Sequence, residues 1–173
     1  MLFNTLEYFL FLPISFLLYW SIKNTTTQNI LVLASSYVFY GWWDWRFLFL
    51  IFISTVADYF VAIKIEKTDY KERKRVYLLL SIIFNLTILI FFKYYNFFIE
   101  SWVELLSSIG YHVKDVWTLK IILPVGISFY TFQTMSYSLD VYRNDIKATR
   151  DFISFASFVS FFPQLVASPI ERA

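Results

Sequence analysis

Cysteine is absent from this chain of 173 residues, and histidine occurs only once. Disulfides, thiolate metal sites and cysteine nucleophiles are therefore excluded, and one histidine cannot build a histidine-rich metal site. The three glycines are too few and too scattered for a phosphate-binding glycine loop. A net charge of +2 gives no support for nucleic-acid binding. From the residues alone we expect no metal site, no bound cofactor and no nucleic-acid partner.

Charged residues make up 16% of the chain, whereas soluble domains carry about 25%. Six segments contain no Asp, Glu, Lys or Arg, and they are residues 8–22, 24–43, 47–57, 76–92, 121–139 and 152–170. A helix that crosses a bilayer needs about 20 mainly apolar residues, and it satisfies its own backbone in hydrocarbon. The sequence therefore predicts an all-α polytopic membrane protein with a single membrane domain over residues 1–173. The predicted spans are about 5–22, 28–43, 47–63, 76–97 and 121–141.

Prolines and apolar spacing mark three departures from straight spans. Pro13 predicts a bend or break in the first span because proline removes a backbone donor. Residues 101–109 place apolar side chains on one helix face, which predicts an amphipathic helix in the outer interface. Residues 152–170 contain Pro163 and Pro169, so we expect this segment to be broken or re-entrant. The prediction is thus five to six transmembrane or re-entrant helices and one interfacial helix.

Basic residues predict the orientation of these spans in the lipid bilayer. The connection 64–75 contains six Lys and Arg residues, and the segment after the fifth span adds Arg143, Lys147 and Arg150. Because cytoplasmic loops are enriched in Lys and Arg, we expect both segments to face the cytoplasm. The N-terminus is then predicted to be extracytoplasmic.

Four segments carry recognisable motifs, and they are SSYVFYGWWDWRFLFLIFISTVADYF (35–60), FFKYYNFF (91–98), LPVGISFYTFQTMSYSLDVYR (123–143) and FFPQLVASPIERA (161–173). Together they resemble the membrane-bound O-acyltransferase family, in its alginate O-acetyltransferase-like branch. The resemblance implies a multi-helix enzyme of the bacterial inner membrane, with tilted helices around a funnel. It implies transfer of an acyl group, typically acetyl, from a cytoplasmic donor such as acetyl-CoA to hydroxyls of an exopolysaccharide such as alginate. A periplasmic acetyltransferase is an implied partner.

Members of this family are usually several hundred residues long, and their catalytic histidine follows the motif that corresponds to residues 161–173. By this resemblance we expect the chain to be the N-terminal portion of a longer acyltransferase, with no catalytic residue of its own and no activity in isolation. Ser168 stands where the family motif usually has glycine. His112 lies outside the family's histidine context and is interpreted as a solvated or interfacial side chain. The alternatives are a non-enzymatic membrane subunit, a transporter fragment or an inactive truncated copy.

Two groups of polar side chains are candidates for lining the funnel or contacting substrate. The first is a stripe at helical spacing, formed by Gln133, Ser136, Tyr137 and Asp140. The second surrounds the broken segment and comprises Pro163, Gln164, Pro169, Glu171 and Arg172. Polar side chains within an apolar span normally face a bundle interior or a water-filled path. Hydrogen bonding between helices and a structural corner of the chain are the alternatives.

Asp58 and Asn85 are polar side chains inside other predicted spans. For Asp58 two interpretations carry equal weight, a functional acid that faces a cavity and a structural acid that pairs with Lys64 or another basic side chain. Asn85 is expected to form a hydrogen bond between helices.

Overall fold

The computed structural model describes residues 5–42, 44–109 and 126–167. Within these ranges the chain forms helices and no strand, which confirms the predicted all-α class for the described part. The helices are α1 (Leu6–Ser21), α2 (Thr25–Gly41), α3 (Trp45–Lys67), α4 (Lys71–Ser108), α5 (Ile127–Arg143), α6 (Phe152–Ser160) and α7 (Phe162–Ala167).

Short polar side chains define where several helices begin. Asn24 accepts a hydrogen bond from the Thr26 backbone at 3.0 Å, and Asp44 accepts one from the Arg46 backbone at 3.0 Å. These are the contacts expected of N-cap residues, because the first backbone N–H groups of a helix have no intrahelical acceptor. The Arg46 guanidinium also donates to Asp44, and this hydrogen bond lowers the pKa of the Asp44 carboxyl. At the end of α5, Asn144 adopts the left-handed conformation with φ of 62°, which asparagine tolerates better than most residues.

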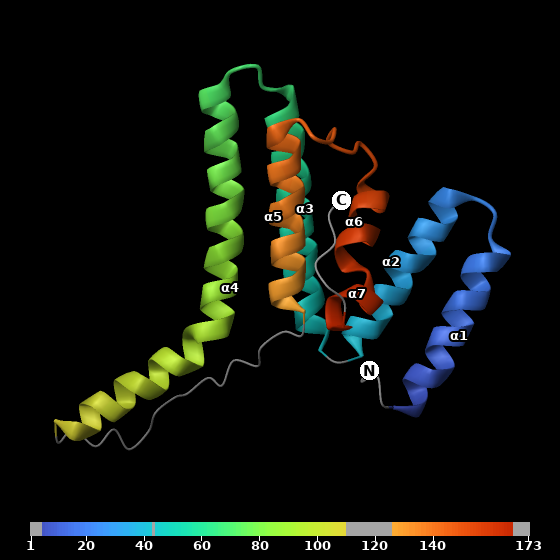
Figure 1. Cartoon of the computed structure of the whole chain (residues 1–173). Helices are drawn as coiled ribbons and strands as arrows, with labels where there is room; N and C mark the ends of the chain where they lie inside the picture. The colour runs from blue at the N-terminus through green and yellow to red at the C-terminus, as the bar shows by residue number, and fades with distance from the viewer. Residues whose placement is uncertain (1–4, 43, 110–125, 168–173) are drawn as a thin grey trace.

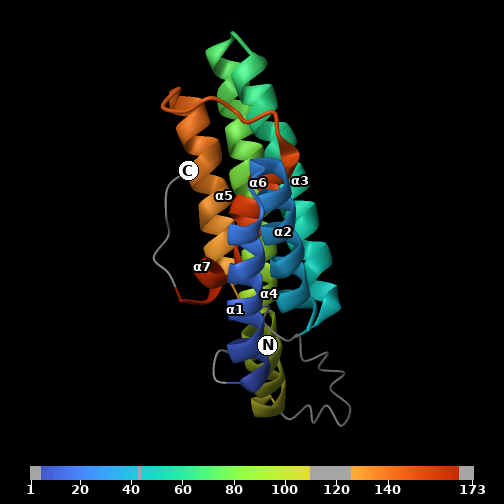
Figure 2. The same cartoon turned by 90° about the vertical axis from the view of Figure 1, so that its right-hand side faces the viewer.

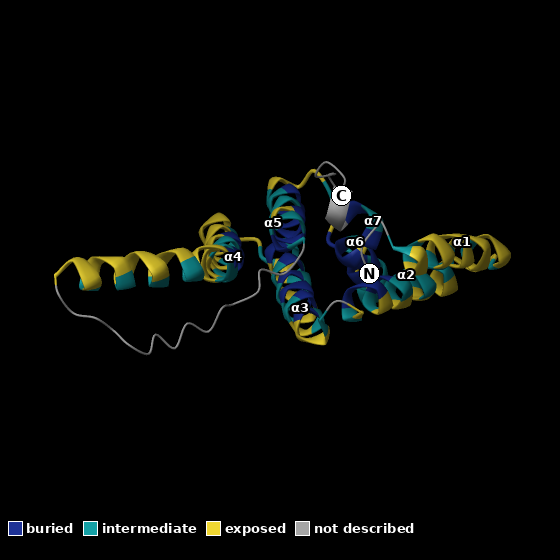
Figure 3. Ribbon diagram, turned by 90° about the horizontal axis from the view of Figure 1, so that it is seen from below, coloured by how far each residue is buried: buried dark blue, intermediate teal, exposed yellow. Residues whose placement is uncertain are grey.

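The helices pack in two neighbouring groups. α3, α4 and α5 lie against one another, α2 packs against α6, and α3 contacts both α2 and α6. Figures 1 and 2 show α1 outermost, beside α2 and away from α3, α4 and α5. Seen from below, buried residues concentrate on α3, α5 and α6, whereas α1 and the end of α4 are largely exposed (Figure 3). No residue of α1 is buried. The apolar exteriors of these helices suit lipid contact rather than water.

The directions of the helices follow the alternation that the basic residues predict. Consecutive helices from α1 to α5 run in opposite directions, so the α3–α4 turn and the connection after α5 lie at the same end (Figure 1). We call this the basic end, because residues 64–75 and 143–150 surround it. That the basic end faces the cytoplasm stays a prediction.

Two helices, α3 with 23 residues and α4 with 38, are long and apolar enough to cross a membrane by length and composition. α1 has 16 residues, and α2 and α5 have 17 each. These three are shorter than the roughly 20 residues that usually span the hydrocarbon. The length and composition of α3 and α4 are consistent with a membrane protein, while the predicted number of spans stays a prediction.

The structure corrects the predicted boundary between the fourth span and the interfacial helix. Residues 76–97 and 101–109 were expected to form two elements, but α4 runs continuously to Ser108. The reason is local, since residues 76–108 contain neither glycine nor proline to stop a helix. The last turns of α4 point away from the other helices (Figure 1). They carry exposed Phe98 and Trp102, both 64% exposed, as an interfacial segment would.

The prolines have different consequences in the two apolar segments that contain them. α1 continues through Pro13, so of the two predicted consequences, a bend or a break, the break does not occur. An exposed membrane-type helix tolerates the single missing donor, because hydrogen bonds on both sides maintain the helix. In residues 152–167 the helix is interrupted at Phe161, since α6 ends at Ser160 and α7 begins at Phe162, and whether the segment 152–170 spans or re-enters the membrane stays a prediction. Pro163 then lies in the first turn of α7, where a missing backbone N–H has little cost.

Candidate functional site

The two groups of candidate side chains meet where α5 faces the break between α6 and α7. Gln133 of α5 and Gln164 of α7 are buried, with 3% and 8% of their surfaces exposed. Gln133 Nε2 donates to the backbone carbonyl of Phe158 at 3.1 Å and reaches Gln164 Oε1 at 3.5 Å. The backbone N–H of Phe162 donates to the buried Ser36 hydroxyl at 3.2 Å, which anchors the start of α7 to α2. The break therefore brings Gln164 against the polar stripe of α5.

These contacts determine the orientation of both side-chain amides. The Phe158 carbonyl can only accept, so Gln133 must present its nitrogen, and the same nitrogen faces Gln164. Gln164 consequently presents its oxygen to Gln133 and leaves its own nitrogen for another partner. Gln164 Nε2 is buried and has no hydrogen-bond partner among the described residues. A buried donor without an acceptor lowers the stability of the fold by about 1–3 kcal/mol. A ligand oxygen that accepted this hydrogen bond would restore that stability.

A polar cavity of about 350 Å³, which we call the Gln164 pocket, lies at this junction. The residues that line it are Asn29, Ser154, Ser157, Phe158, Phe161 and Gln164. Amide and hydroxyl groups share the wall with two phenylalanine rings, and none of these described lining residues is charged. Neutral hydrogen-bonding groups beside apolar rings suit an uncharged ligand with hydroxyl or carbonyl oxygens.

A chain of hydrogen bonds organises one part of the pocket wall. Asn29 Nδ2 donates to Ser154 Oγ at 2.8 Å, and Ser154 Oγ donates to an Asp151 carboxylate oxygen at 2.9 Å. Asp151 also caps α6 by accepting from the Ile153 backbone at 2.9 Å. The hydrogen bond from the Ser154 hydroxyl, together with backbone N–H groups, lowers the pKa of Asp151. The carboxylate is therefore ionised at neutral pH and fixes Ser154 and Asn29 in position.

A second buried cluster, which we call the Asp58 network, joins α3, α4 and α5. The Asp58 carboxylate accepts from Ser81 Oγ at 2.6 Å and from Asn85 Nδ2 at 2.9 and 2.8 Å. Thr134 Oγ1 of α5 lies 3.5 Å from Asn85 Oδ1, and Ser138 Oγ lies 3.5 Å from Ser81 Oγ. Each of these five residues is at most 2% exposed.

The Asp58 network corrects one sequence interpretation and confirms another. The pairing of Asp58 with Lys64 is wrong, because the carboxylate contacts Ser81 and Asn85 while Lys64 Nζ lies 5.8 Å from the centre of the Tyr77 ring. The interhelical hydrogen bond expected of Asn85 is confirmed. Among the described residues, no group of three or more Asp, Glu, His or Cys could hold a metal ion.

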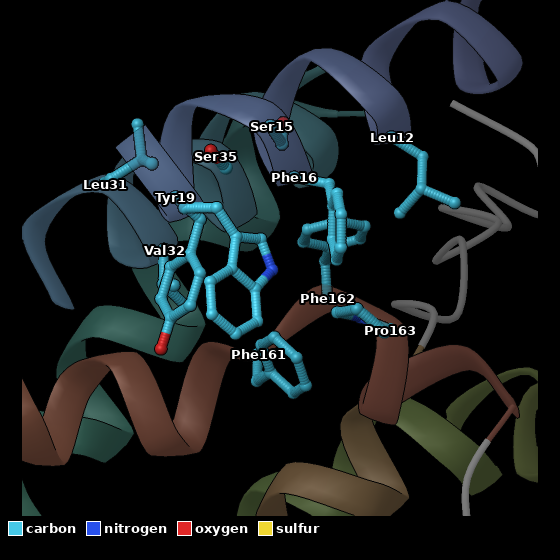
Figure 4. Close-up of a pocket in the computed structure, with 11 residues that line it drawn as sticks. Leu12, Ser15, Phe16, Tyr19, Leu31, Val32, Ser35, Phe161, Phe162 and Pro163 are labelled. Carbon is cyan, nitrogen blue, oxygen red and sulfur yellow. The ribbon is translucent and has the colours of Figure 1, made fainter. Parts of the chain in front are cut away.

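An apolar groove of about 490 Å³ lies between α1, α2 and the start of α7 (Figure 4). Its walls are Leu12, Ser15, Phe16, Tyr19 and Trp20 of α1, Leu31, Val32 and Ser35 of α2, and Phe161, Phe162 and Pro163. Phe161 lines both this groove and the Gln164 pocket. The break between α6 and α7 therefore stands between an apolar cavity and a polar one. Four buried hydroxyls of the described chain also lack a partner, but they line neither cavity, and they belong to Tyr40, Ser54, Tyr130 and Thr131.

Known proteins resemble nearly the whole chain. A probable alginate O-acetylase of Pseudomonas aeruginosa is 41% identical over 165 residues, which are 95% of this chain and 31% of that protein. A second, of Azotobacter vinelandii, is 40% identical over 95% of this chain and 32% of that protein. A peptidoglycan O-acetyltransferase of Helicobacter pylori is 36% identical over 98% of this chain and 37% of that protein. The chain belongs to the membrane-bound O-acyltransferase family.

The chain spans about a third of the length of the curated relatives it matches. No protein-family model matches it, and no solved structure does. The relatives confirm the family resemblance drawn from the four motif segments, including its alginate O-acetylase branch.

Tyr137 of α5 has contacts that support a structural role. Its hydroxyl accepts a hydrogen bond from the Thr149 backbone at 2.9 Å, and its ring packs on Phe155 with ring centres 4.7 Å apart. Tyr137 thus ties α5 to the connection before α6 and to α6 itself. We assign it no contact with a ligand.

The remaining predicted residues divide between the described and the undescribed chain. Ser136 is half-buried and Asp140 is buried, and neither bonds to Gln133 or Gln164 in the described structure. Pro163 lines the apolar groove. The other predicted positions lie outside the described residues, and they are His112, Ser168, Pro169, Glu171 and Arg172.

Sequence reasoning missed three polar residues of the Gln164 pocket. Four residues that line the pocket follow one another at intervals of three, four and three positions, and they are Ser154, Ser157, Phe161 and Gln164. This is the spacing of residues on one face of a helix, continued across the break. That periodicity was available in the sequence. Asn29 had no such signal, because its contact with Ser154 joins positions 125 residues apart.

Proposed function

We propose that this chain forms part of an enzyme that transfers acetyl groups to hydroxyls of an extracellular polysaccharide of the alginate or peptidoglycan kind. The names and the 36–41% identity of the relatives support this proposal. The acetyl donor is a thioester such as acetyl-CoA, and the rest of the protein completes the transfer site. A periplasmic acetyltransferase partner then acts on the same acceptor.

The observation that carries the proposal is the Gln164 side chain, which lines a polar pocket and whose buried Nε2 has no partner among the described residues. Acyl transfer develops negative charge on the carbonyl oxygen of the acyl group, and side-chain amides are among the donors that stabilise it. Gln164 donates its free N–H to this oxygen. Gln133 holds the amide in that orientation, because its own nitrogen is bound to the Phe158 carbonyl and faces Gln164 Oε1.

The reaction needs one more group than the described residues supply. The hydroxyl oxygen of the acceptor attacks the acetyl carbonyl carbon, the carbon–sulfur bond of the donor breaks, and the thiol leaves. A general base must take the hydroxyl proton, and a histidine is the most common choice. His112 lies outside the described residues and outside the family's histidine context, so we assign this step to a histidine in another part of the protein.

The direction of transfer follows from the charge distribution. The Gln164 pocket extends from Ser154, near the start of α6 and close to the basic end, towards the break at Phe161. If the basic end faces the cytoplasm of the bacterial inner membrane, as the positive-inside rule predicts, the donor enters at that end. The acetyl group then reaches the break, and the acceptor approaches from the opposite side.

The test replaces Gln164 in the protein expressed from its own gene in its native membrane. Gln164→Leu removes the donor at similar volume, and we expect the rate of acetyl ester formation on the polysaccharide to fall about 100-fold or more. Gln164→Glu should fall similarly, because an ionised carboxylate cannot donate. Thr87→Leu, a polar-to-apolar change on the exposed face of α4, is the matched control and should keep its rate.

Two outcomes would contradict the proposal. A Gln164→Leu protein that is folded and transfers acetyl at the wild-type rate would remove Gln164 from the site. A wild-type protein that forms no acetyl ester on any polysaccharide would favour a non-enzymatic membrane subunit.

A further inference from the structure

A polar cleft lies at the basic end of the molecule, between the α3–α4 turn and the end of α5 (Figure 1). It has a volume of about 280 Å³, and we call it the lysine cleft. The side chains that line it come from the turn, from the start of α4 and from the end of α5, and they are Asp69, Lys71, Lys74, Tyr142 and Asn144. None of them lines the Gln164 pocket or the apolar groove, so the lysine cleft is separate from the candidate site described above.

The two lysines of this cleft have no anionic partner among the described residues. The ion pairs that the described chain forms lie elsewhere, and Asp69 pairs with neither lysine although it lines the same cleft. Lys74 Nζ donates to the neutral Asn144 Oδ1 at 3.5 Å. Two ammonium groups therefore line one cleft without a carboxylate in ion-pair contact. An anion that entered the cleft would interact favourably with both lysines.

Two neutral groups from α5 and its end add hydrogen-bond donors. Because a lysine ammonium can only donate, Asn144 presents its Oδ1 to Lys74 and keeps its Nδ2 as a donor. The Asn144 backbone is fixed as well, since its N–H donates to the Val141 carbonyl at 3.1 Å. The hydroxyl of Tyr142 can also donate. Ammonium groups together with neutral donors suit the oxygens of a phosphate group, which only accept hydrogen bonds.

The charge of the cleft indicates which kind of phosphate fits. Two lysines and one aspartate give its lining a formal charge of +1. A phosphate diester carries one negative charge, whereas a phosphate monoester carries about −1.5 to −2 at neutral pH. A diester therefore balances the charge of the cleft. A monoester or a diphosphate would place surplus negative charge beside the Asp69 carboxylate.

The surroundings of the cleft favour a diester that belongs to a membrane lipid. The apolar surface of α4 begins two residues after Lys74, where Val76 and Leu79 are 54% and 46% exposed. A lipid with its phosphate in the cleft can lay its acyl chains along this surface. The basic end also attracts anionic membranes, because residues 64–75 and 143–150 contain nine Lys and Arg but only four Asp and Glu. Basic pockets between membrane helices bind anionic headgroups in this way.

We propose that the lysine cleft binds the phosphate diester of an anionic phospholipid such as phosphatidylglycerol. The phosphate oxygens accept hydrogen bonds from Lys71 and Lys74, and the Asp69 carboxylate accepts one from a glycerol hydroxyl of the headgroup. The lipid thereby joins the start of α4 to the end of α5 at the membrane surface. This binding does not depend on the proposed acetyl transfer.

The first experiment removes the two ammonium groups. The protein is expressed from its own gene, freed of lipid in mild detergent, titrated with phosphatidylglycerol and analysed by native mass spectrometry. In the double variant Lys71→Gln with Lys74→Gln, we expect the affinity for one phosphatidylglycerol to fall about 30-fold. The matched control is Arg73→Gln with Arg75→Gln, which removes the same charge from the same turns of α4 at residues that do not line the cleft. It should keep the wild-type affinity within about threefold.

Three results of this titration would overturn the proposal. An equal loss of affinity in the two double variants would show general attraction to a basic surface instead of a built site. Unchanged affinity in the lysine variant would remove the cleft from lipid binding. Equal binding of phosphatidylcholine by the wild type would show that the negative charge of the lipid is not recognised.

The second experiment locates the lipid in the wild-type protein and identifies the source of the phosphate. Phosphatidylglycerol with a photoreactive diazirine in its headgroup is activated in phosphatidylcholine bilayers that contain the protein, and the labelled peptides are identified. We expect labelling of residues 69–74 and 142–144 that excess phosphatidylglycerol removes and that ADP or inorganic phosphate leaves in place. Removal by ADP or inorganic phosphate would assign the cleft to a soluble phosphate and overturn the lipid proposal. Labelling confined to other segments would overturn it as well.

Discussion

The Asp58 network and the Gln164 pocket are both buried and polar, yet they use their hydrogen-bonding groups differently. In the Asp58 network, the carboxylate receives donors from two residues of α4, and the cluster lines neither of the two cavities. In the Gln164 pocket, an amide nitrogen has no partner although it is buried beside a cavity of about 350 Å³. The first region is complete within the described chain. In the Gln164 pocket, the Gln164 nitrogen has no acceptor among the described residues.

This difference suggests a structural role for the Asp58 network and a ligand-binding role for the Gln164 pocket. Hydrogen bonds between helices hold membrane-type bundles together, because lipid offers no competing water. A buried network whose members satisfy one another therefore contributes to stability. A buried donor without a partner lowers stability until a ligand supplies an acceptor. We therefore expect substitutions in the Asp58 network to reduce stability and substitutions in the Gln164 pocket to reduce activity.

The largest effect is expected from Asn85→Leu. This change removes the two hydrogen bonds that Asn85 Nδ2 donates to the Asp58 carboxyl, and with them the contacts of the Asn85 amide with the Ser81 carbonyl and Thr134 Oγ1. Each intramolecular hydrogen bond contributes about 0.5–1.5 kcal/mol, and a buried polar atom left without its partner costs about 1–3 kcal/mol more. We expect unfolding free energy to fall by about 3 kcal/mol and the melting temperature in detergent to fall by about 6–12 °C.

A double substitution tests whether Asn85 contributes to stability through its contact with the Asp58 carboxyl. Replacing both partners, Asp58→Leu with Asn85→Leu, removes the buried carboxyl together with its Asn85 donor, and replacement of both partners by apolar groups can be nearly neutral. The double variant should therefore melt closer to the wild type than Asn85→Leu does. Thr87→Leu, two residues further along α4 and exposed, controls for added hydrophobicity. A double variant that melts below the single one would show that the Asp58 carboxylate is not what makes Asn85 important.

The sequence predicted the helical segments well because lipid-facing helices are apolar over their whole surface. Helix ends were less accurate, as the continuous α4 shows, because a helix continues until glycine, proline or a cap stops it. Of the pocket, Gln133 and Gln164 were predicted from local spacing and from the nearby prolines. Their contact was not, and neither was the contribution of Asn29, because both depend on how distant helices pack. The contacts of Tyr137 could not be predicted either. Helical spacing does not distinguish a hydroxyl that bonds to a distant backbone from one that faces a cavity.

A smaller effect is expected from Tyr137→Phe, which tests whether this stripe residue is structural. The variant loses one hydroxyl and leaves the Thr149 backbone N–H without its acceptor. A single neutral hydrogen bond contributes about 1 kcal/mol, so the melting temperature should fall by about 2–4 °C. Tyr94→Phe on the exposed part of α4 is the matched control and should melt as the wild type does. An unchanged melting temperature for Tyr137→Phe would return Tyr137 to the candidates for ligand contact.

The smallest effect on stability is expected from Gln164→Leu, and it bears most directly on the contrast between the two regions. Gln164 Nε2 has no hydrogen bond to lose, and Oε1 accepts only the long contact of 3.5 Å from Gln133, which keeps its bond to Phe158. Removal of an unpaired buried amide offsets the loss of that contact, so the unfolding free energy should change by less than about 1 kcal/mol. Thermal melts of Gln164→Leu and Asn85→Leu in the same detergent compare the two regions directly. If both variants lost similar stability, the Gln164 pocket would be ordinary bundle interior, and its unpartnered nitrogen would no longer indicate a ligand.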